Sequence, residues 1–196
     1  MLDLVLYVLE KFFRNLADFL HGIRLLQRKP PEKFSKPLRL DLGIGLSKPP
    51  GFVGIDIALL PRVDLIHDLE TGLPFPDSSV REIRASHTLE HLPHRTIPTL
   101  LRECFRVLEP GGKITIKVPD LEKVMRSFLK LNEEKRWKEA WEWIFGSQSR
   151  KGQFHKTGFT KPRLRRLLNE SGFADITIAN YRTGVRSSLS ATATKH

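Results

Sequence analysis

The residue types best suited to chemistry in this chain are two carboxylates separated by a glycine-rich turn. Asp41 and Asp56 lie near the ends of two short apolar runs, and Gly43 and Gly45 lie between them. The carboxyl ends of parallel strands form the edge where open α/β sheets bind ligands, and glycine lets a ligand approach the backbone there. A carboxylate at Asp56 can accept hydrogen bonds from both hydroxyls of a ribose. The spacing therefore indicates a site for a nucleoside-containing cofactor.

The elements that would position these residues alternate between strand and helix patterns, which is typical of a mostly parallel sheet. We expect strands at Leu38–Leu42, Phe52–Ile55, Val63–His67, Arg81–Ala85 and Lys113–Val118, and closing strands at Ile176–Tyr181 and Ser188–Thr194. We expect helices at Thr96–Val107, at Asp120–Phe145 and from Thr160 to about Asn169, and turns at Glu109–Gly112 and Gly184. The sequence thus predicts a doubly wound α/β sheet closed by an antiparallel strand.

The first 28 residues have the apolar spacing of an amphipathic helix, Leu2–Leu26, which a proline-rich linker, Arg28–Pro37, ends. Its longest uncharged run, Leu4–Leu9, is far shorter than the roughly 20 residues that span a bilayer. We expect the helix to pack on the domain or in a homodimer, and we keep contact with a membrane surface as an alternative. We expect residues 1–196 to form a single domain without a transmembrane segment.

The formal net charge of +11 is concentrated in the second part of the chain. Residues 1–112 contain 15 Lys/Arg and 14 Asp/Glu, whereas residues 113–196 contain 18 and 8. This basic field favours an anionic partner, although a solvated lysine-rich surface is the simpler interpretation. Cys104 is the single cysteine, so no intramolecular disulfide can form, and no signal-peptide pattern is present. Both observations favour a cytoplasmic protein.

Several sequence blocks, in a fixed order, make the chain resemble the class I S-adenosylmethionine-dependent methyltransferases. The blocks are Asp41–Gly45, Gly54–Asp56, His67–Asp77 with Leu-Pro-Phe-Pro-Asp at its end, Leu89–Leu92, and Arg106–Gly112 with the sequence Arg-Val-Leu-Glu-Pro-Gly-Gly. The resemblance implies a Rossmann-like fold and S-adenosylmethionine as the cofactor. It places the cofactor-binding core at residues 38–119, a helical lid insertion at 120–159 and a closing helix and strands at 160–196.

The resemblance implies a cofactor-binding role for nine residues. Asp41, Gly43 and Gly45 would hold the methionine part, Asp56 and Ile57 the ribose and adenine, Asp68 and Leu69 the adenine amino group and ring, and Ser86 and His87 the methionine tail and transferable methyl. For Asp41 and Asp68 the alternative is a carboxylate that only caps a turn.

The connection between the first two strands departs from the family pattern. It has about nine residues, Gly43–Gly51, whereas a helical crossover needs a dozen or more. A loop must therefore replace the helix that normally faces the cofactor, and Ser47 stands where a third glycine is usual. We expect the helix Leu2–Leu26 to cover the sheet face that the missing helix would leave.

Methyl transfer to a hydroxyl needs a base, and histidine is the usual choice. The candidates are His87, His91 and His155, of which His155 lies in the polar loop of the lid. The segments Trp143–Gly146 and Gly152–Phe159 are similar to the branch of the family associated with modification of cell-surface sugars. We therefore expect O-methylation of a small or glycosyl acceptor.

Other functions share parts of this pattern. The run His87–His91 matches the His-x-x-Glu-His zinc signature of inverzincin proteases. It follows directly on a predicted strand and Pro93 interrupts any helix, so we assign no metal ligands. A methyltransferase-like scaffold without activity is the stronger alternative. A nicotinamide dehydrogenase is disfavoured because Lys48 replaces the third glycine of its motif. Methylation of nucleic-acid amino groups is disfavoured because Ala85–Thr88 lacks the usual Pro-Pro-aromatic tetrad.

Overall fold

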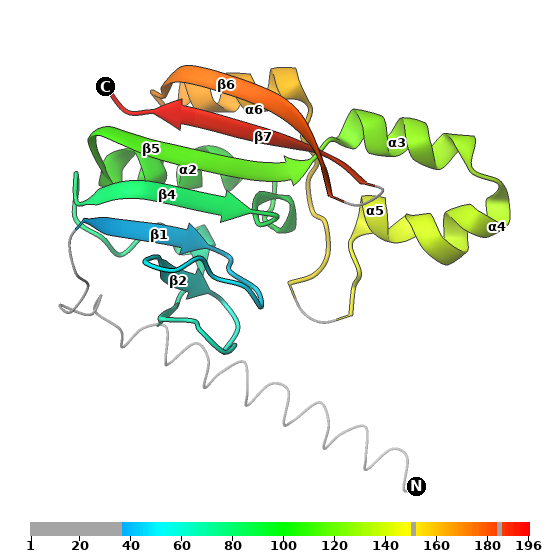
Figure 1. Cartoon of the computed structure of the whole chain (residues 1–196), viewed down its shortest axis with the longest axis horizontal. Helices are drawn as coiled ribbons and strands as arrows, with labels where there is room; N and C mark the ends of the chain where they lie inside the picture. The colour runs from blue at the N-terminus through cyan, green and yellow to red at the C-terminus, as the bar shows by residue number, and fades with distance from the viewer. Residues whose placement is uncertain (1–36, 150–151, 184–185) are drawn as a thin grey trace, which may run out of the picture. The chain divides into compact units, whose positions relative to one another are not determined.

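A seven-stranded sheet of order β3-β2-β1-β4-β5-β7-β6 organises the residues that the computed structural model describes, which are 37–149, 152–183 and 186–196 (Figure 1). The strands are β1 Leu38–Leu42, β2 Val53–Asp56, β3 Leu65–Ile66, β4 Val80–Ser86, β5 Leu108–Pro119, β6 Ala174–Thr183 and β7 Arg186–Thr194. The first five strands pair in parallel, and β7 runs antiparallel to both β5 and β6. The predicted fold class is confirmed, and each predicted strand overlaps an observed one.

Helices α2 and α6 lie behind the sheet in Figure 1, and α3, α4 and α5 lie beyond the carboxyl end of β5. They are α2 Ile97–Val107, α3 Leu121–Lys130, α4 Glu133–Lys135, α5 Trp141–Phe145 and α6 Lys161–Glu170, with 3-10 turns η1 Leu69–Thr71 and η2 Leu89–His91 and a π-helical segment η3 Arg136–Ala140. The predicted helical segment Asp120–Phe145 is helical over most of its length, but it is divided after α3. Leu131 is extended after α3, and the side chain of Asn132 accepts a hydrogen bond from the Lys135 amide at 2.9 Å, which starts a new helix.

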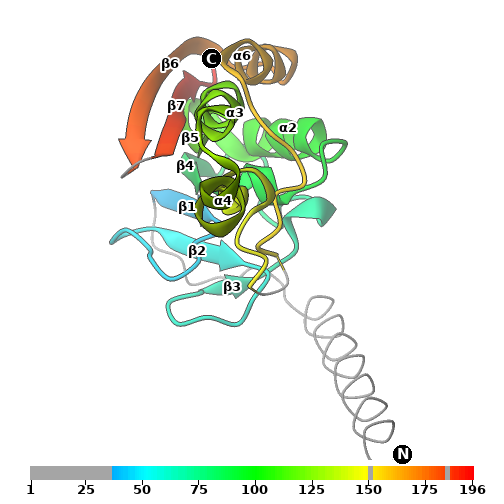
Figure 2. The ribbon, with the colours of Figure 1, turned by 90° about the vertical axis from the view of Figure 1, so that its right-hand side faces the viewer.

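The hydrophobic core lies between the sheet and the helices α2 and α6, which pack on the same face (Figure 2). Apolar residues at alternate positions of the strands face these helices, because side chains alternate between the two faces of a sheet. They include Leu40, Leu42, Ile83, Ala85, Ile114, Ile116, Leu189 and Ala191, all of them buried. Cys104 of α2 belongs to this core, and burial raises the pKa of its thiol to about 12. It is a packing residue.

The opposite face of β1 and β4 carries charged pairs instead of apolar side chains. Arg39 lies 2.6 Å from Glu82, and Arg84 lies 2.6 Å from Asp41. The helix Leu2–Leu26, which we expected to cover this face, lies outside the described residues. These two pairs make this part of the face polar among the described residues.

The connection between β1 and β2 contains no helix, as its length predicts. Its path is fixed by hydrogen bonds to β2, in which the Gly43 amide donates to the Ile55 carbonyl at 2.7 Å. The Asp64 carboxylate accepts a hydrogen bond from the Gly54 amide at 2.7 Å and pairs with Lys48. The loop therefore leaves the carboxyl end of β1 open.

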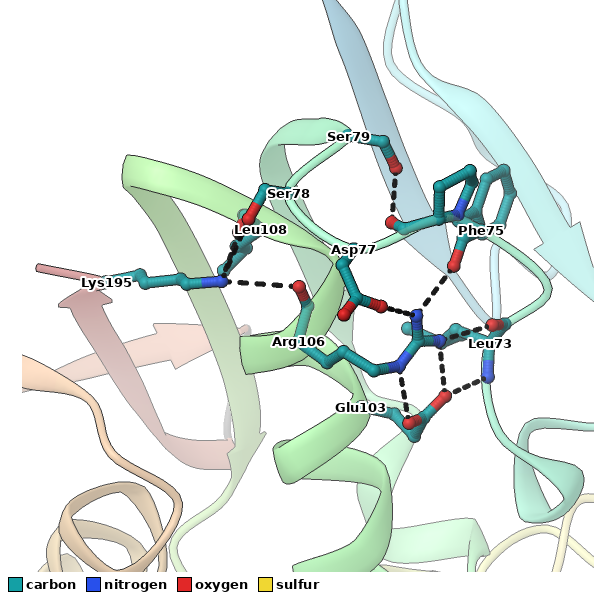
Figure 3. A network of polar contacts seen from close by, with 10 residues as sticks. Leu73, Phe75, Asp77, Ser78, Ser79, Glu103, Arg106, Leu108 and Lys195 are labelled. Carbon is teal, nitrogen blue, oxygen red and sulfur yellow. Dashed lines mark hydrogen bonds and ion pairs between the residues drawn. The ribbon is translucent and has the colours of Figure 1, made fainter.

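A single arginine joins the two sequence blocks that carried much of the family resemblance (Figure 3). Arg106 donates to the carbonyls of Leu73 and Phe75 at 2.9 Å each and to the Asp77 carboxylate at 2.6 Å. It donates to both oxygens of Glu103 as well, at 2.8 and 2.7 Å, so all five of its N–H donors are used. These bonds hold the pKa of Glu103 at about 2. The Leu-Pro-Phe-Pro-Asp and Arg-Val-Leu-Glu-Pro-Gly-Gly blocks therefore fasten the loop before β4 to the end of α2.

The prediction of a turn at Glu109–Gly112 is wrong, because these residues belong to β5. Between Val80 and Glu82 of β4 the paired residue on β5 advances from Leu108 to Lys113. The segment is thus an irregular bulge with three extra residues on β5, and Gly111 within it has a φ of 75°. The side chain of Lys195 donates to the Leu108 carbonyl at 2.6 Å and fixes the bulge to the last residues of the chain (Figure 3).

The turn at Gly184 between β6 and β7 lies outside the described residues. Within the described parts of the chain, the helices lack the length and hydropathy needed to cross a bilayer.

Candidate functional site

A cavity of about 450 Å³ lies at the carboxyl ends of β1, β2, β3 and β4, and we call it the edge cavity. Its size falls within the roughly 300–1,000 Å³ typical of ligand sites. Eight of the nine residues predicted to bind the cofactor line it: Gly43, Gly45, Asp56, Ile57, Asp68, Leu69, Ser86 and His87. The sheet therefore brings together residues from four separate strand ends, at the point where the strand order reverses.

Backbone amides hold the two carboxylates of the edge cavity that were predicted from sequence, Asp56 and Asp68. Asp56 accepts hydrogen bonds from the Gly45 amide at 3.0 Å and from the Ala58 amide at 2.9 Å. Asp68 accepts from the Glu70 amide at 2.9 Å and thereby caps η1. A carboxylate offers about four lone-pair positions, so both groups retain acceptor capacity toward a ligand. Asp68 thus combines the capping role with a position in the cavity wall.

The two glycines of the turn are needed for different reasons. Both have positive φ, 67° at Gly43 and 56° at Gly45. A Cβ at Gly43 would lie 2.4 Å from the Thr88 methyl group, so the missing side chain makes room for Thr88. At Gly45 a Cβ would meet nothing within 4 Å, and its backbone faces open space. Gly45 is therefore the position where a ligand can approach the main chain.

Asp41 differs from the other predicted residues in its environment. Its side chain is 1% exposed and lies on the polar face of β1, away from the edge cavity lining. It accepts a hydrogen bond from Arg84 at 2.6 Å. Burial raises the pKa of Asp41 to about 6, against the opposing effect of Arg84. Asp41 is thus paired with Arg84 of the neighbouring strand β4 and does not line the edge cavity, unlike the other eight predicted residues.

A second cavity of about 260 Å³ adjoins the first beneath the insertion 120–159, and we call it the lid cavity. The insertion supplies Trp143, Gly146, Ser147, Gln153 and His155, and the sheet side supplies His87, Glu90, His91 and Ser188, among other residues. The two ends of the insertion meet, because the Leu121 amide donates to the Phe159 carbonyl at 2.9 Å. His87, His91 and Gln153 line both cavities.

His87 lies at the junction of the two cavities in a strained backbone conformation, with a φ of 55°. Its amide donates to the Lys117 carbonyl at 2.8 Å. Its Nδ1 lies 3.0 Å from the Glu90 carboxylate, and its Nε2 lies 2.9 Å from the Tyr181 hydroxyl. With Glu90 ionised, Nδ1–H donates to it, and Nε2 is left as the proton acceptor of the ring.

The other two candidate histidines face each other across the lid cavity. The rings of His91 and His155 are 5.0 Å apart between centroids. His91 donates from Nδ1 to the Phe154 carbonyl at 3.0 Å, which leaves its Nε2 without a proton in the neutral ring. Burial lowers the pKa of His155, although the nearby Glu90 carboxylate acts in the opposite direction. The three histidines predicted from sequence therefore share one cavity.

Sequence reasoning did not assign Glu90 or Tyr181 to the methyltransferase site. Glu90 is 1% exposed, and its place between two histidines in the His-x-x-Glu-His run was the signal that could have identified it. Tyr181 is separated from His87 by 94 positions and ends a predicted strand, so no local pattern could have identified it.

Comparisons with known proteins agree with this geometry. A family model described as a methyltransferase domain matches residues 50–178, more than half of the chain. A probable S-adenosylmethionine-dependent methyltransferase of Mycolicibacterium smegmatis is 32% identical over 114 residues, which are 57% of this chain and 44% of that protein. The chain therefore matches less than half of that relative's length.

Solved structures show the same fold at low sequence identity. A SAM-dependent methyltransferase of Methanosarcina mazei superposes with a TM-score of 0.58 at 20% identity, covering 80% of this chain and 91% of that one. The 1,6-didemethyltoxoflavin-N1-methyltransferase of Burkholderia thailandensis, solved with its substrate and S-adenosylhomocysteine, gives 0.54 at 15% identity, covering 81% and 71%. From the family match and the ligand-sized hollow at the strand ends, we conclude that the chain belongs to the class I S-adenosylmethionine-dependent methyltransferases.

Proposed function

We propose that this domain transfers the methyl group of S-adenosylmethionine to a hydroxyl oxygen of a small polar acceptor, such as a sugar. The observation that carries the proposal is the junction of the two cavities, where His87, His91 and Gln153 line both. A cofactor in the edge cavity can thus present its methyl group to an acceptor in the lid cavity. The acceptor hydroxyl would lie beside His87, which would accept its proton.

The edge cavity suits the cofactor chemically. Asp56 would accept from the ribose hydroxyls and Asp68 from the adenine amino group, while the open backbone at Gly45 would face the methionine part. Leu46 and Ile57 are 72% and 43% exposed on the cavity wall and would pack on the adenosyl group. When bound, the cofactor supplies an electrophilic methyl group on a positively charged sulfur.

The residues of the chain position the acceptor and accept its proton. The acceptor oxygen would form a bond to the methyl carbon as the carbon–sulfur bond breaks, with the electron pair of that bond remaining on the sulfur. The proton of the hydroxyl goes to Nε2 of His87, which the Glu90 carboxylate orients through Nδ1. In the absence of an acceptor, Tyr181 satisfies that same Nε2. The lid excludes water from the transfer.

The lid cavity favours a hydroxylated acceptor over an apolar one. Its wall combines the indole of Trp143 with the hydroxyls of Ser147 and Ser188 and the amide of Gln153. An aromatic face with several polar groups around it is suited to a sugar ring. The volume of about 260 Å³ lies below the usual range for larger ligands, which supports a single ring or the end of a chain.

A product screen tests this proposal. The full chain is incubated with S-adenosylmethionine and a panel of sugars, sugar nucleotides, phenols and amines, and products are examined by mass spectrometry for the gain of one CH₂ group. We expect an O-methylated product with the parent protein and a strongly reduced amount with His87→Gln. An N-methylated product would keep the transfer but overturn the choice of oxygen. Cofactor binding without any product would favour the scaffold function.

A further inference from the structure

Three potential metal ligands converge in the lid cavity. Glu90, His91 and His155 each place one ligand atom within 4.8 Å of the others. Glu90 and His91 come from η2, whereas His155 comes from the loop that follows α5, so the fold and not the local sequence brings them together. This separation in the chain shows that tertiary packing forms the cluster.

The buried carboxylate of Glu90 also indicates that the cluster could hold a cation. Its side chain is almost fully buried, and its Oε2 has no hydrogen-bond partner among the described residues. Its Oε1 is already used by His87, at 3.0 Å. A buried carboxylate oxygen without a partner carries a large desolvation cost. A cation in the lid cavity would remove that cost.

The donors are held by contacts outside the cluster. His91 donates from Nδ1 to the Phe154 carbonyl, which leaves Nε2 free of a proton and able to bind a cation. The Glu90 carbonyl accepts from the Lys156 and Thr157 amides at 2.7 and 3.2 Å, which fixes the loop around His155 against η2. Carbonyl partners of this kind set the orientation of metal-binding imidazoles in known sites.

We infer that Glu90, His91 and His155 bind a divalent first-row transition-metal ion. Two imidazoles and one carboxylate form a donor set that suits Zn²⁺, Fe²⁺ or Co²⁺ better than Mg²⁺, which prefers oxygen ligands. The lid cavity leaves the remaining coordination positions open to water or to an acceptor. This inference reverses the expectation from sequence, which assigned no metal ligands because the His87–His91 run follows a strand and Pro93 interrupts any helix.

The role of the ion rests on the proposed function, whereas its binding does not. An ion at this position would lie close to His87, because Glu90 contacts His87 and would also bind the ion. It would polarise the acceptor hydroxyl, whose proton then passes to His87. It would also orient a second oxygen of the acceptor, such as a neighbouring hydroxyl.

Metal titration of the full chain tests the inference. The protein is freed of metal with a chelator, then titrated with Co²⁺ and followed by its visible absorption, and with Zn²⁺ and Mg²⁺ in a calorimeter. We expect one Co²⁺ or Zn²⁺ per chain and much weaker binding of Mg²⁺. His91→Ala and His155→Ala should each weaken binding by more than the roughly tenfold to hundredfold that loss of an outer-shell partner causes.

The controls separate this site from surface histidines and from unfolding. His94 is exposed and lies three positions after His91, so His94→Ala should bind the ion like the parent. Glu90→Gln keeps the shape of the side chain and should lose the ion, and thermal unfolding shows whether each variant is folded. Co²⁺ binding that is absent, or that persists in folded His91→Ala, His155→Ala and Glu90→Gln, would overturn the inference. S-adenosylmethionine binding is measured separately, so failure of the metal site and failure of the proposed function are distinguishable.

Discussion

The Nδ1 atom of His87 lies 3.0 Å from the carboxylate of Glu90, a pairing that joins the strained end of β4 to a buried turn. The same imidazole contacts Tyr181 through Nε2 at 2.9 Å. One ring therefore has an anionic partner on one side and an exchangeable hydroxyl partner on the other. This arrangement supports the proposal that His87 accepts a proton beside the edge cavity.

Replacing His87 tests its role as the proton acceptor. His87→Gln should lower kcat by about 10²- to 10⁴-fold, the range for loss of a general base, while the affinity for S-adenosylmethionine changes little. The two quantities are measured by product formation at saturating cofactor and by calorimetry. A variant that keeps the parent kcat would assign the proton to another group.

The two glycines of the first turn should respond differently to alanine. Gly43→Ala places a Cβ 2.4 Å from the Thr88 methyl at positive φ, so overpacking and backbone strain together should cost about 2 to 4 kcal/mol of unfolding free energy. Gly45→Ala adds only the backbone term, about 1 kcal/mol, but its methyl group would project into the edge cavity. We expect it to weaken cofactor binding more than stability. Urea unfolding and calorimetry of both variants compare the two effects, and equal losses of stability would contradict the assignment.

Arg106 should be a main determinant of stability near the edge of the sheet. Arg106→Met removes five hydrogen bonds and leaves the Leu73 and Phe75 carbonyls and two carboxylates without this partner, which should cost about 2 to 4 kcal/mol. Arg102→Met, on an exposed position of the same helix, should change stability by less than about 0.5 kcal/mol. Chemical unfolding of the two variants gives the comparison, and similar values would show that the network contributes little.

The buried carboxylate of Asp41 predicts a specific dependence of stability on pH. Burial raises its pKa from 3.8 in an exposed chain to about 6, so the folded state binds the proton more tightly than the unfolded state. Its favourable contribution is full below pH 3.8 and is lost as the pH rises through 6. Asp41→Asn removes this titration. The unfolding free energy of the parent minus that of the variant should therefore fall between pH 3.8 and 6, and a difference that rises instead would show that Arg84 dominates.

The sheet could be predicted well because local sequence specifies it. The run from Leu38 to Leu42 and the short Pro-Pro-Gly connection after it determine a strand followed by a loop, and both are observed. The break at Leu131 and the bulge at Glu109–Gly112 were missed. The first depends on a single cap at Asn132 and the second on the register with β4, which no local pattern reports.

The site was predictable only in part, for a physical reason. Residues at strand ends meet wherever the strands are parallel, so Asp56, Asp68 and His87 could be placed at one edge from the order of the strands. The packing of the lid loop against η2 could not, because it depends on tertiary hydrogen bonds such as those to the Glu90 carbonyl. The meeting of His91 and His155 is a consequence of that packing.

The central claim is that the edge cavity binds an adenosyl group through carboxylates at the strand ends, and titration calorimetry with S-adenosylmethionine tests it most directly. The parent should bind one molecule per chain, and Asp56→Asn should bind about ten- to hundredfold more weakly, while Asp175→Asn, at an exposed carboxylate of β6, should bind like the parent. No binding to the folded parent, or equal affinity of the parent and Asp56→Asn, would contradict the account.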